Sequence, residues 1–229
     1  MKSFLLSLSL LVLLACEKNT AKTMKPTDTL TYLAIGDSYT IGEAVPLSAS
    51  FPHQLCHLLN AKGLGIATPR IIAKTGWTSA ELQEGIRSSG VKEHFDLVTL
   101  LIGVNNQYRG ESESKYREEF RNLLERAIQF AAGKKAHVFV ISIPDWGATP
   151  YGQQSGRDTE VITAEINAFN AINKEETLAQ GISYTDITPA SGLAKSDGSL
   201  VASDGLHPSA KMYLEWAVQL EPKVLKGLK

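Results

Sequence analysis

The sequence is poor in cysteine, lacks an excess of either charge and has no hydrophobic run long enough to span a bilayer. Two cysteines, Cys16 and Cys56, occur in 229 residues, which excludes a small fold held by several disulfides. Lys+Arg number 23 against 24 Asp+Glu, a formal net charge of -1, so no basic field attracts nucleic acid. The apolar stretch over residues 4–14 is too short for a membrane helix.

That stretch has the features of a secretion signal. It follows Lys2 and ends in Leu14-Ala15-Cys16, so we expect residues 1–15 to be a signal peptide. A small residue before a cysteine resembles the lipobox of bacterial lipoproteins, which implies cleavage before Cys16, lipidation of its sulfur and attachment to a membrane in the periplasm or at the cell surface. An ordinary signal peptide with a coincidental cysteine is the alternative, because Leu14 is a less usual neighbour.

The rest of the chain divides into a short tether and one domain. Residues 16–29 are polar and rich in Lys and Thr, as expected of a flexible tether. If Cys16 carries lipid, Cys56 is the only free cysteine and no disulfide within the chain forms. With 43% hydrophobic and 21% charged residues, residues 30–229 have the composition of a single globular domain with a substantial core.

Strand and helix patterns alternate along this domain. Short apolar runs predict strands, and apolar residues at helical spacing predict the helices between them. The expected strands cover residues 30–36, 70–73, 96–102, 136–141 and 181–185, and four of the main helices cover 51–61, 114–132, 158–178 and 210–220. A further helix carries Leu82 and Ile86, starts after a cap at Thr78 or Ser79 and ends before Gly90. Such alternation predicts a three-layer α/β/α sandwich with a five-stranded parallel sheet. Because parallel strands share a direction, the loops after them meet at one edge.

The first strand pattern stops at Gly36-Asp37-Ser38. Ser38 is then placed at the carboxyl end of a buried strand, where open α/β sheets carry their ligand sites. This is a suitable position for a nucleophile. The alternative is that Asp37 or Ser38 merely caps the next helix.

A second polar group lies near the C-terminus, where Asp204 and His207 flank Gly205. A turn at Gly205 would set the carboxylate against one ring nitrogen and leave the other free to accept a proton from a serine. The alternative is a helix-capping loop with an exposed histidine and Pro208 in the first helical turn.

Acyl transfer also needs donors for the developing oxyanion. Gly76 follows the second strand and offers an unhindered backbone N–H, while Asn105 follows the third strand and offers a side-chain amide. Each has a simpler interpretation, a turn requiring positive φ for Gly76 and a self-bonded loop residue for Asn105. His53 and His57 lie four apart on one helix, but with no further ligand nearby in sequence we predict no metal site.

Together these blocks resemble the SGNH (GDSL-type) hydrolase family. Gly36-Asp37-Ser38, Gly76, Gly103-Val104-Asn105-Asn106 and Asp204-Gly205-Leu206-His207-Pro208 match its four blocks in order, over residues 32–220. The resemblance implies a flavodoxin-like sandwich in which Ser38 is the nucleophile, His207 the base and Asp204 its orienting acid. The oxyanion hole would comprise Ser38 N–H, Gly76 N–H and the Asn105 amide.

Two positions depart from the family pattern. The third block usually ends in Asp, whereas Asn106 stands here, a change expected to affect the local loop geometry more than activity. Tyr39 replaces the common leucine after the serine. Asp37, no longer needed as the triad acid, is expected to shape the turn that presents Ser38.

The expected function is hydrolysis of carboxylic esters through an acyl-Ser38 intermediate, without a cofactor. We expect a small-molecule or carbohydrate ester substrate with a short acyl group, such as acetyl, because no long apolar lid segment is present. Lysophospholipids and thioesters are alternative substrates, and a non-catalytic carbohydrate-binding lipoprotein is the alternative outside enzymes. Four aromatic residues on strand-end loops would stack on a sugar, line an acyl groove or simply pack at the rim: Trp77, Tyr108, Trp146 and Tyr151.

The sequence lacks the motifs of two other classes of protein. No Gly-x-Ser-x-Gly elbow occurs, which argues against an α/β-hydrolase of that type. Residues 36–42 lack the glycine spacing of a dinucleotide-binding loop. The sequence does not indicate the oligomeric state.

Overall fold

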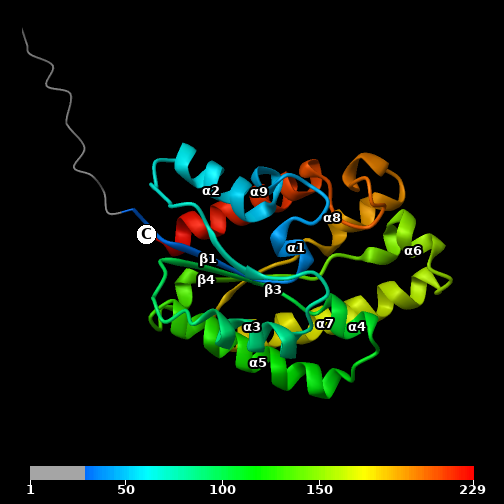
Figure 1. Cartoon of the computed structure of the whole chain (residues 1–229), viewed down its shortest axis with the longest axis horizontal. Helices are drawn as coiled ribbons and strands as arrows, with labels where there is room; N and C mark the ends of the chain where they lie inside the picture. Colours follow the sequence, from blue (N-terminus) through cyan, green and yellow to red (C-terminus); the bar gives the residue numbers. More distant parts are fainter. Residues whose placement is uncertain (1–28) are drawn as a thin grey trace, which may run out of the picture.

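A computed structural model describes residues 29–229 of the chain (Figure 1). The predicted signal peptide, Cys16 and the tether up to residue 28 lie outside the described residues, so export and lipidation stay predictions. Within the described part, no helix combines the length and the apolar character needed to cross a membrane.

The centre of the fold is a five-stranded parallel sheet in the order β2-β1-β3-β4-β5. Its central strands β1, β3 and β4 are buried along their whole length, as expected for a parallel sheet covered on both faces. The strands are β1 (Tyr32–Gly36), β2 (Arg70–Ala73), β3 (Leu97–Leu101), β4 (Val138–Ile141) and β5 (Ser183–Thr185). The predicted α/β/α sandwich is confirmed.

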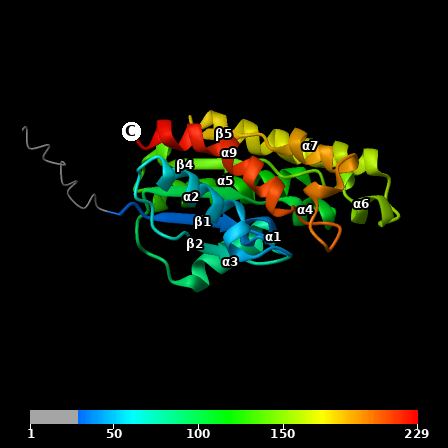
Figure 2. The same ribbon diagram turned by 90° about the horizontal axis from the view of Figure 1, so that it is seen from above.

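Helices cover both faces of this sheet (Figures 1 and 2). On one face α2 (Phe51–Ala61) packs against α9 (Ala210–Gly227), and on the other α5 (Glu113–Phe130) packs between α3 (Ser79–Ser89) and α7 (Thr159–Ala179). Their starts follow capping signals: Thr78 forms a capping box with Glu81, and Asp158 caps α7.

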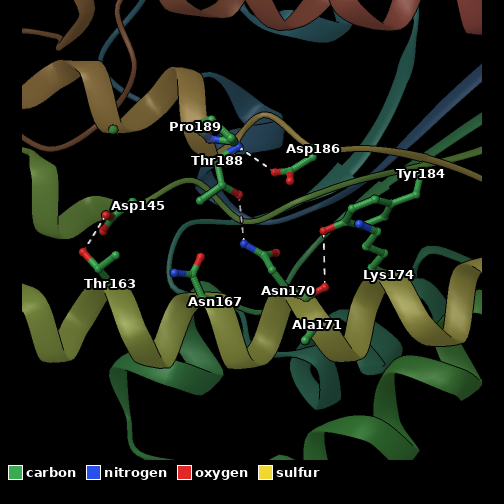
Figure 3. A pocket seen from close by; sticks show the side chains of 11 residues that line it. Asp145, Thr163, Asn167, Asn170, Ala171, Lys174, Tyr184, Asp186, Thr188 and Pro189 are labelled. Carbon is green, nitrogen blue, oxygen red and sulfur yellow. Dashed lines mark hydrogen bonds between the residues drawn. The ribbon is translucent and has the colours of Figure 1, made fainter.

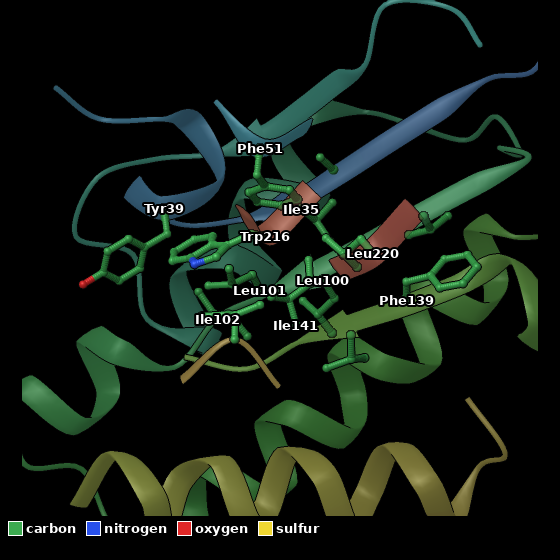
Figure 4. Packing of buried hydrophobic residues seen from close by; sticks show 14 of the residues in the cluster. Ile35, Tyr39, Phe51, Leu100, Leu101, Ile102, Phe139, Ile141, Trp216 and Leu220 are labelled. Atoms are coloured by element: carbon green, nitrogen blue, oxygen red, sulfur yellow. The ribbon is translucent and has the colours of Figure 1, made fainter. Parts of the chain in front are cut away.

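Aromatic packing joins α9 to α2 and to Tyr39, which lies just after β1 (Figure 4). The fully buried Trp216 of α9 lies edge-on to Tyr39, with ring centroids 6.3 Å apart, and its ring centroid is 6.4 Å from that of Phe51 on α2. Beneath them, strand residues such as Ile35 and Leu100 fill the sheet surface. This packing fixes α9, and therefore the loop before it, relative to the end of β1.

The structure differs from the sequence prediction at the start of β4, at the end of α9 and in several additional short helices. His137 was expected inside the fourth strand but lies in a single 3-10 turn, Lys135–His137, because the pairing with β3 begins at Val138. The last helix continues to Gly227, past Pro222, since its buried face extends to Val224. Short helices that periodicity cannot detect follow four of the strands: α1 (Ser38–Ile41), α4 (Val104–Tyr108), α6 (Pro150–Gln154) and α8 (Thr188–Gly192).

Candidate active site

Ser38 is the first residue of α1, at the carboxyl end of β1. Asp37 caps this single turn, its Oδ1 accepting a hydrogen bond from Tyr39 N–H at 3.0 Å. A Cβ at Gly36 would lie 2.2 Å from both Leu101 O and Thr40 Oγ1, so only glycine allows the turn to fold this close to β3. The Gly-Asp-Ser block therefore builds a tight turn that presents Ser38.

His207 and Asp204 reach Ser38 from the loop before α9. His207 Nε2 lies 3.0 Å from Ser38 Oγ, and Nδ1 lies 2.6 Å from Asp204 Oδ2. Asp204 Oδ1 accepts from the N–H groups of Leu206 and His207, both at 3.0 Å. Partial burial would raise the pKa of Asp204, but the hydrogen bonds from the His207 side chain and these N–H groups outweigh it and hold that pKa below its ordinary value.

The direction of these hydrogen bonds follows from the charge on Asp204. An ionised carboxylate only accepts, so Nδ1 of His207 carries the proton and Nε2 is left to accept from the Ser38 hydroxyl. The His207 ring is held in place by Tyr39, whose ring packs edge-on with centroids 5.6 Å apart. Tyr39, the departure from the usual leucine, thus links His207 to Trp216.

Gly76 and Asn105 face the same pocket as Ser38 and His207. Gly76 has φ +83°, a left-handed conformation that favours glycine. Asn105 is the second residue of α4, and its Nδ2 donates to Trp77 O at 2.9 Å. An amide nitrogen carries two hydrogens, so the second remains available for a ligand oxygen. The structure thus gathers residues from four segments at the predicted edge of the sheet.

The pocket that these residues share has a volume of about 200 Å³. Besides the residues above, its walls include three of the four predicted aromatics. Tyr108 of α4 and Tyr151 of α6 lie with their hydroxyls 3.2 Å apart, and both rings pack against Trp146. Trp77 does not line the pocket: its ring lies over Gly85 of α3, where a Cβ would come within 2.1 Å of the indole.

A larger hollow of about 420 Å³ lies elsewhere, between α7 and the segment after β5 (Figure 3). Its buried polar groups bond to one another: Thr163 Oγ1 donates to Asp145 Oδ2 at 2.7 Å, and Asn170 Nδ2 lies 3.0 Å from Thr188 Oγ1. No histidine lines it, so no hydroxyl in this hollow has an imidazole base beside it. Size alone therefore does not mark the reactive site.

Among residues 29–229, no group of three His, Cys, Asp or Glu side chains is arranged to hold a metal ion. His53, half of the histidine pair considered above, has its Nδ1 3.0 Å from Ser50 Oγ at the start of α2. This contact ties His53 to the residue that precedes its own helix.

Comparison with known proteins places the chain in a family. The sequence model of the GDSL-like Lipase/Acylhydrolase family matches residues 34–214, a range that contains all the pocket residues described above. The chain belongs to this family. It is therefore a carboxylic ester hydrolase of the SGNH type.

Solved structures with the same fold have low sequence identity to this GDSL-like hydrolase. A lipase/acylhydrolase from Enterococcus faecalis has 19% identity and a TM-score of 0.66, covering 88% of this chain and 98% of its own. An acetyl-xylooligosaccharide esterase from Geobacillus has 17% identity and a TM-score of 0.62, with coverage of 87% and 94%. The esterase EstA from Pseudoalteromonas has 16% identity and a TM-score of 0.64, and the match covers 86% of this chain and 97% of EstA. A search of curated protein sequences found no match.

Sequence reasoning missed several residues around the pocket. Thr75 and Leu206 line it, and Arg109 donates from Nη2 to Gly76 O at 2.6 Å. Gln107 Oε1 accepts from Trp146 Nε1 at 2.8 Å and so holds the indole in the pocket wall. The only available signal was their position in or beside the predicted loops.

Asp37 makes the stability of this GDSL-like hydrolase depend on pH. Its carboxyl is fully buried, with Oδ2 lacking a partner, and burial raises its pKa to about 7 against the lowering effect of Tyr39 N–H. The pKa of Asp37 is higher in the folded state than in the unfolded state. The contribution of Asp37 to the free energy of unfolding is therefore fully present below about pH 4 and is lost as the pH rises through about 7.

We therefore expect Asp37→Asn to remove a pH-dependent loss of stability. Between about pH 4 and about pH 8 the unfolding free energy of the wild type should fall by up to about 4 kcal/mol more than that of the variant. Urea unfolding across this range measures the difference, with Asp158→Asn, an exposed helix cap, as the control. Parallel pH profiles for wild type and Asp37→Asn would contradict the expectation.

Proposed function

We propose that this hydrolase cleaves esters by two-step acyl transfer through an acyl-Ser38 intermediate. The observation that supports this most is the continuous row of hydrogen bonds from Asp204 through His207 to Ser38 Oγ. Ser38 and His207 line the same pocket as Gly76 and Asn105. A nucleophile, a base and an orienting acid at hydrogen-bond distances are the elements that serine-based acyl transfer requires.

In the first step Ser38 Oγ attacks the ester carbonyl as its proton passes to His207 Nε2. The negative charge on the carbonyl oxygen is taken up by the N–H groups of Ser38 and Gly76 and by the Asn105 amide. His207 then gives its proton to the departing alcohol, and the acyl group stays on Ser38. Asp204 keeps the ring oriented and stabilises the imidazolium without being protonated.

In the second step water replaces the alcohol. His207 Nε2 removes a proton from water as it attacks the acyl-Ser38 carbonyl, and the same donors stabilise the second tetrahedral intermediate. Collapse of this intermediate returns the proton from His207 to Ser38 Oγ and releases the acid. The cycle uses only groups of this chain and the solvent.

Replacing Ser38 tests the proposal directly. Ser38→Ala should lower kcat for p-nitrophenyl acetate by at least about 10³-fold, because no oxygen remains to accept the acyl group. Its unfolding midpoint should stay near that of the wild type, since within residues 29–229 the hydroxyl forms a single hydrogen bond, to His207. Full activity in a folded Ser38→Ala protein would refute the role of Ser38.

We further propose that the acyl group is short, with acetyl esters of carbohydrates as the preferred class. The pocket is small, and the Tyr108–Tyr151 hydroxyl contact and the face of Trp146 limit it. Aromatic faces with nearby hydroxyls suit a sugar, which offers C–H groups and hydroxyls together. The acetyl-xylooligosaccharide esterase described above shares the fold and supports this choice. Longer-chain lysophospholipids and thioesters are the second candidates.

Chain-length dependence should follow from these walls. Across p-nitrophenyl esters from acetyl to palmitoyl, kcat/KM should be highest for the shortest acyl groups. Tyr151→Ala should open the wall and raise the ratio of octanoyl to acetyl kcat/KM by about 10-fold, which corresponds to about 1.4 kcal/mol.

Tyr151→Phe is the matched variant, since it keeps the ring and removes only the hydroxyl contact with Tyr108. It should keep the preference for short chains. A wild-type preference for palmitoyl esters would contradict the short-acyl proposal and favour a lipase-like role.

A further inference from the structure

Four hydrogen bonds join α4 and Arg109, the residue after it, to the loop between β2 and α3 and to Ser79, the first residue of α3. Arg109 donates to Gly76 O at 2.6 Å, and Asn105 Nδ2 to Trp77 O at 2.9 Å. Ser79 N–H donates to Asn106 Oδ1 at 3.0 Å, while Asn106 Nδ2 donates to Ser79 Oγ at 2.7 Å. Gly76 belongs to the loop and Asn105 to α4, so these hydrogen bonds hold the two residues next to each other.

We propose that Asn106 and Arg109 are positioning residues that set the spacing between the Gly76 N–H and the Asn105 amide. This inference rests on the proposed acyl transfer, in which both groups bind the same oxyanion. Preorganised donors stabilise such a charge only when held at hydrogen-bond distance from it, and a misplacement of about 1 Å can slow a reaction about 10²-fold.

The charges around Asn106 explain why this position carries an amide rather than the usual acid. Asn106 is fully buried, and its Nδ2 also lies 3.1 Å from Glu111 Oε2. The hydroxyl of Ser79 donates to Glu119 and therefore has a lone pair, not a proton, to offer Asn106. Both groups that face Nδ2 are thus acceptors.

An aspartate at this position would lack the donor. Its second oxygen would face Glu111 Oε2 and Ser79 Oγ, placing a buried negative charge beside another carboxylate. Lys115, 3.2 Å from Glu111 and 3.6 Å from Glu119, already neutralises part of the local charge. The amide of Asn106 therefore matches the carboxylate of Glu111, to which it donates.

Arg109 holds the loop from the solvent side. Its guanidinium bonds Gly76 O and lies 3.2 Å from Glu81, the acidic residue of the α3 capping box. A guanidinium fork can keep both contacts at once. About half of the side chain is exposed, so its replacement should leave the fold intact.

The first experiment compares Asn106→Asp with the double variant Asn106→Asp/Glu111→Gln in hydrolysis of p-nitrophenyl acetate. Asn106→Asp should lower kcat about 10- to 100-fold with KM within about 2-fold of the wild type. In the double variant a Gln amide can donate to the new carboxylate, which should restore kcat to within about 3-fold. Glu111→Gln alone should change little, because its carbonyl still accepts from Asn106.

A purely structural role would give a different pattern. Asn170→Asp, the same change in another buried asparagine outside this network, should lower the thermal midpoint without the selective loss of kcat. Wild-type kcat in folded Asn106→Asp, or no recovery in the double variant, would overturn the proposal. A wild-type protein that hydrolyses no ester would instead refute the proposed function. Failure of the positioning proposal and failure of the proposed function are thus distinguished.

The second experiment decides the matter if Asn106→Asp does not fold. Arg109→Met should lower kcat about 3- to 10-fold at an unchanged thermal midpoint, with KM nearly unchanged. Arg87→Met is the control, because Arg87 is an exposed arginine of α3 that pairs with Glu84 away from the pocket. Equal kcat for Arg109→Met, Arg87→Met and wild type would overturn the role of Arg109.

Discussion

The contact between Ser38 Oγ and His207 Nε2 is the interaction on which the rest of the site depends. It joins residues 169 positions apart at 3.0 Å, so it requires the first strand and the last helix to be fixed against each other. The sheet places Ser38 at the end of β1, and the packing of Trp216 on Tyr39 and Phe51 fixes α9. Tyr39 takes part in both tasks, because it follows Ser38 in α1 and packs against His207.

The two halves of the site are held in different ways. Ser38, His207 and Asp204 depend on hydrophobic packing of α9 and on a turn in which Asp204 accepts from the backbone and from the ring. Gly76 and Asn105 depend on polar bonds between a loop and a five-residue helix too short to be rigid by itself. Polar bonds fix direction more closely than apolar contacts do, which suits donors that must converge on one atom.

The regular elements could be predicted because their signals are local. The helix at Phe51–Ala61 and the strand at Arg70–Ala73 have the predicted bounds, since apolar spacing and glycine punctuation define them. The grouping of Ser38, Gly76 and Asn105 at one edge followed from parallel strands, because each lies just after a strand. His207 was added by its spacing from Asp204, and the packing of α9 brings it to this edge. Their chemical roles stay a proposal.

What could not be predicted depends on contacts between distant segments. The strand position of His137 was wrong because pairing with β3, not local propensity, sets where β4 begins. Trp77 was grouped with the other loop aromatics but packs on Gly85. The bonds of Asn106 to Ser79 and Glu111 reach 27 positions back along the chain and 5 positions forward, and no spacing rule relates them. The reason for its amide became visible only in three dimensions.

The central claim is that the acyl group passes to Ser38. Mixing the wild-type protein with p-nitrophenyl acetate, quenching in acid during turnover and mapping peptides by mass spectrometry tests this most directly. We predict one added acetyl group on the peptide containing Ser38, at this residue and absent from His207→Ala under the same conditions. Turnover with no acetyl on Ser38, or with acetyl at another side chain that disappears at the rate of turnover, would contradict the account.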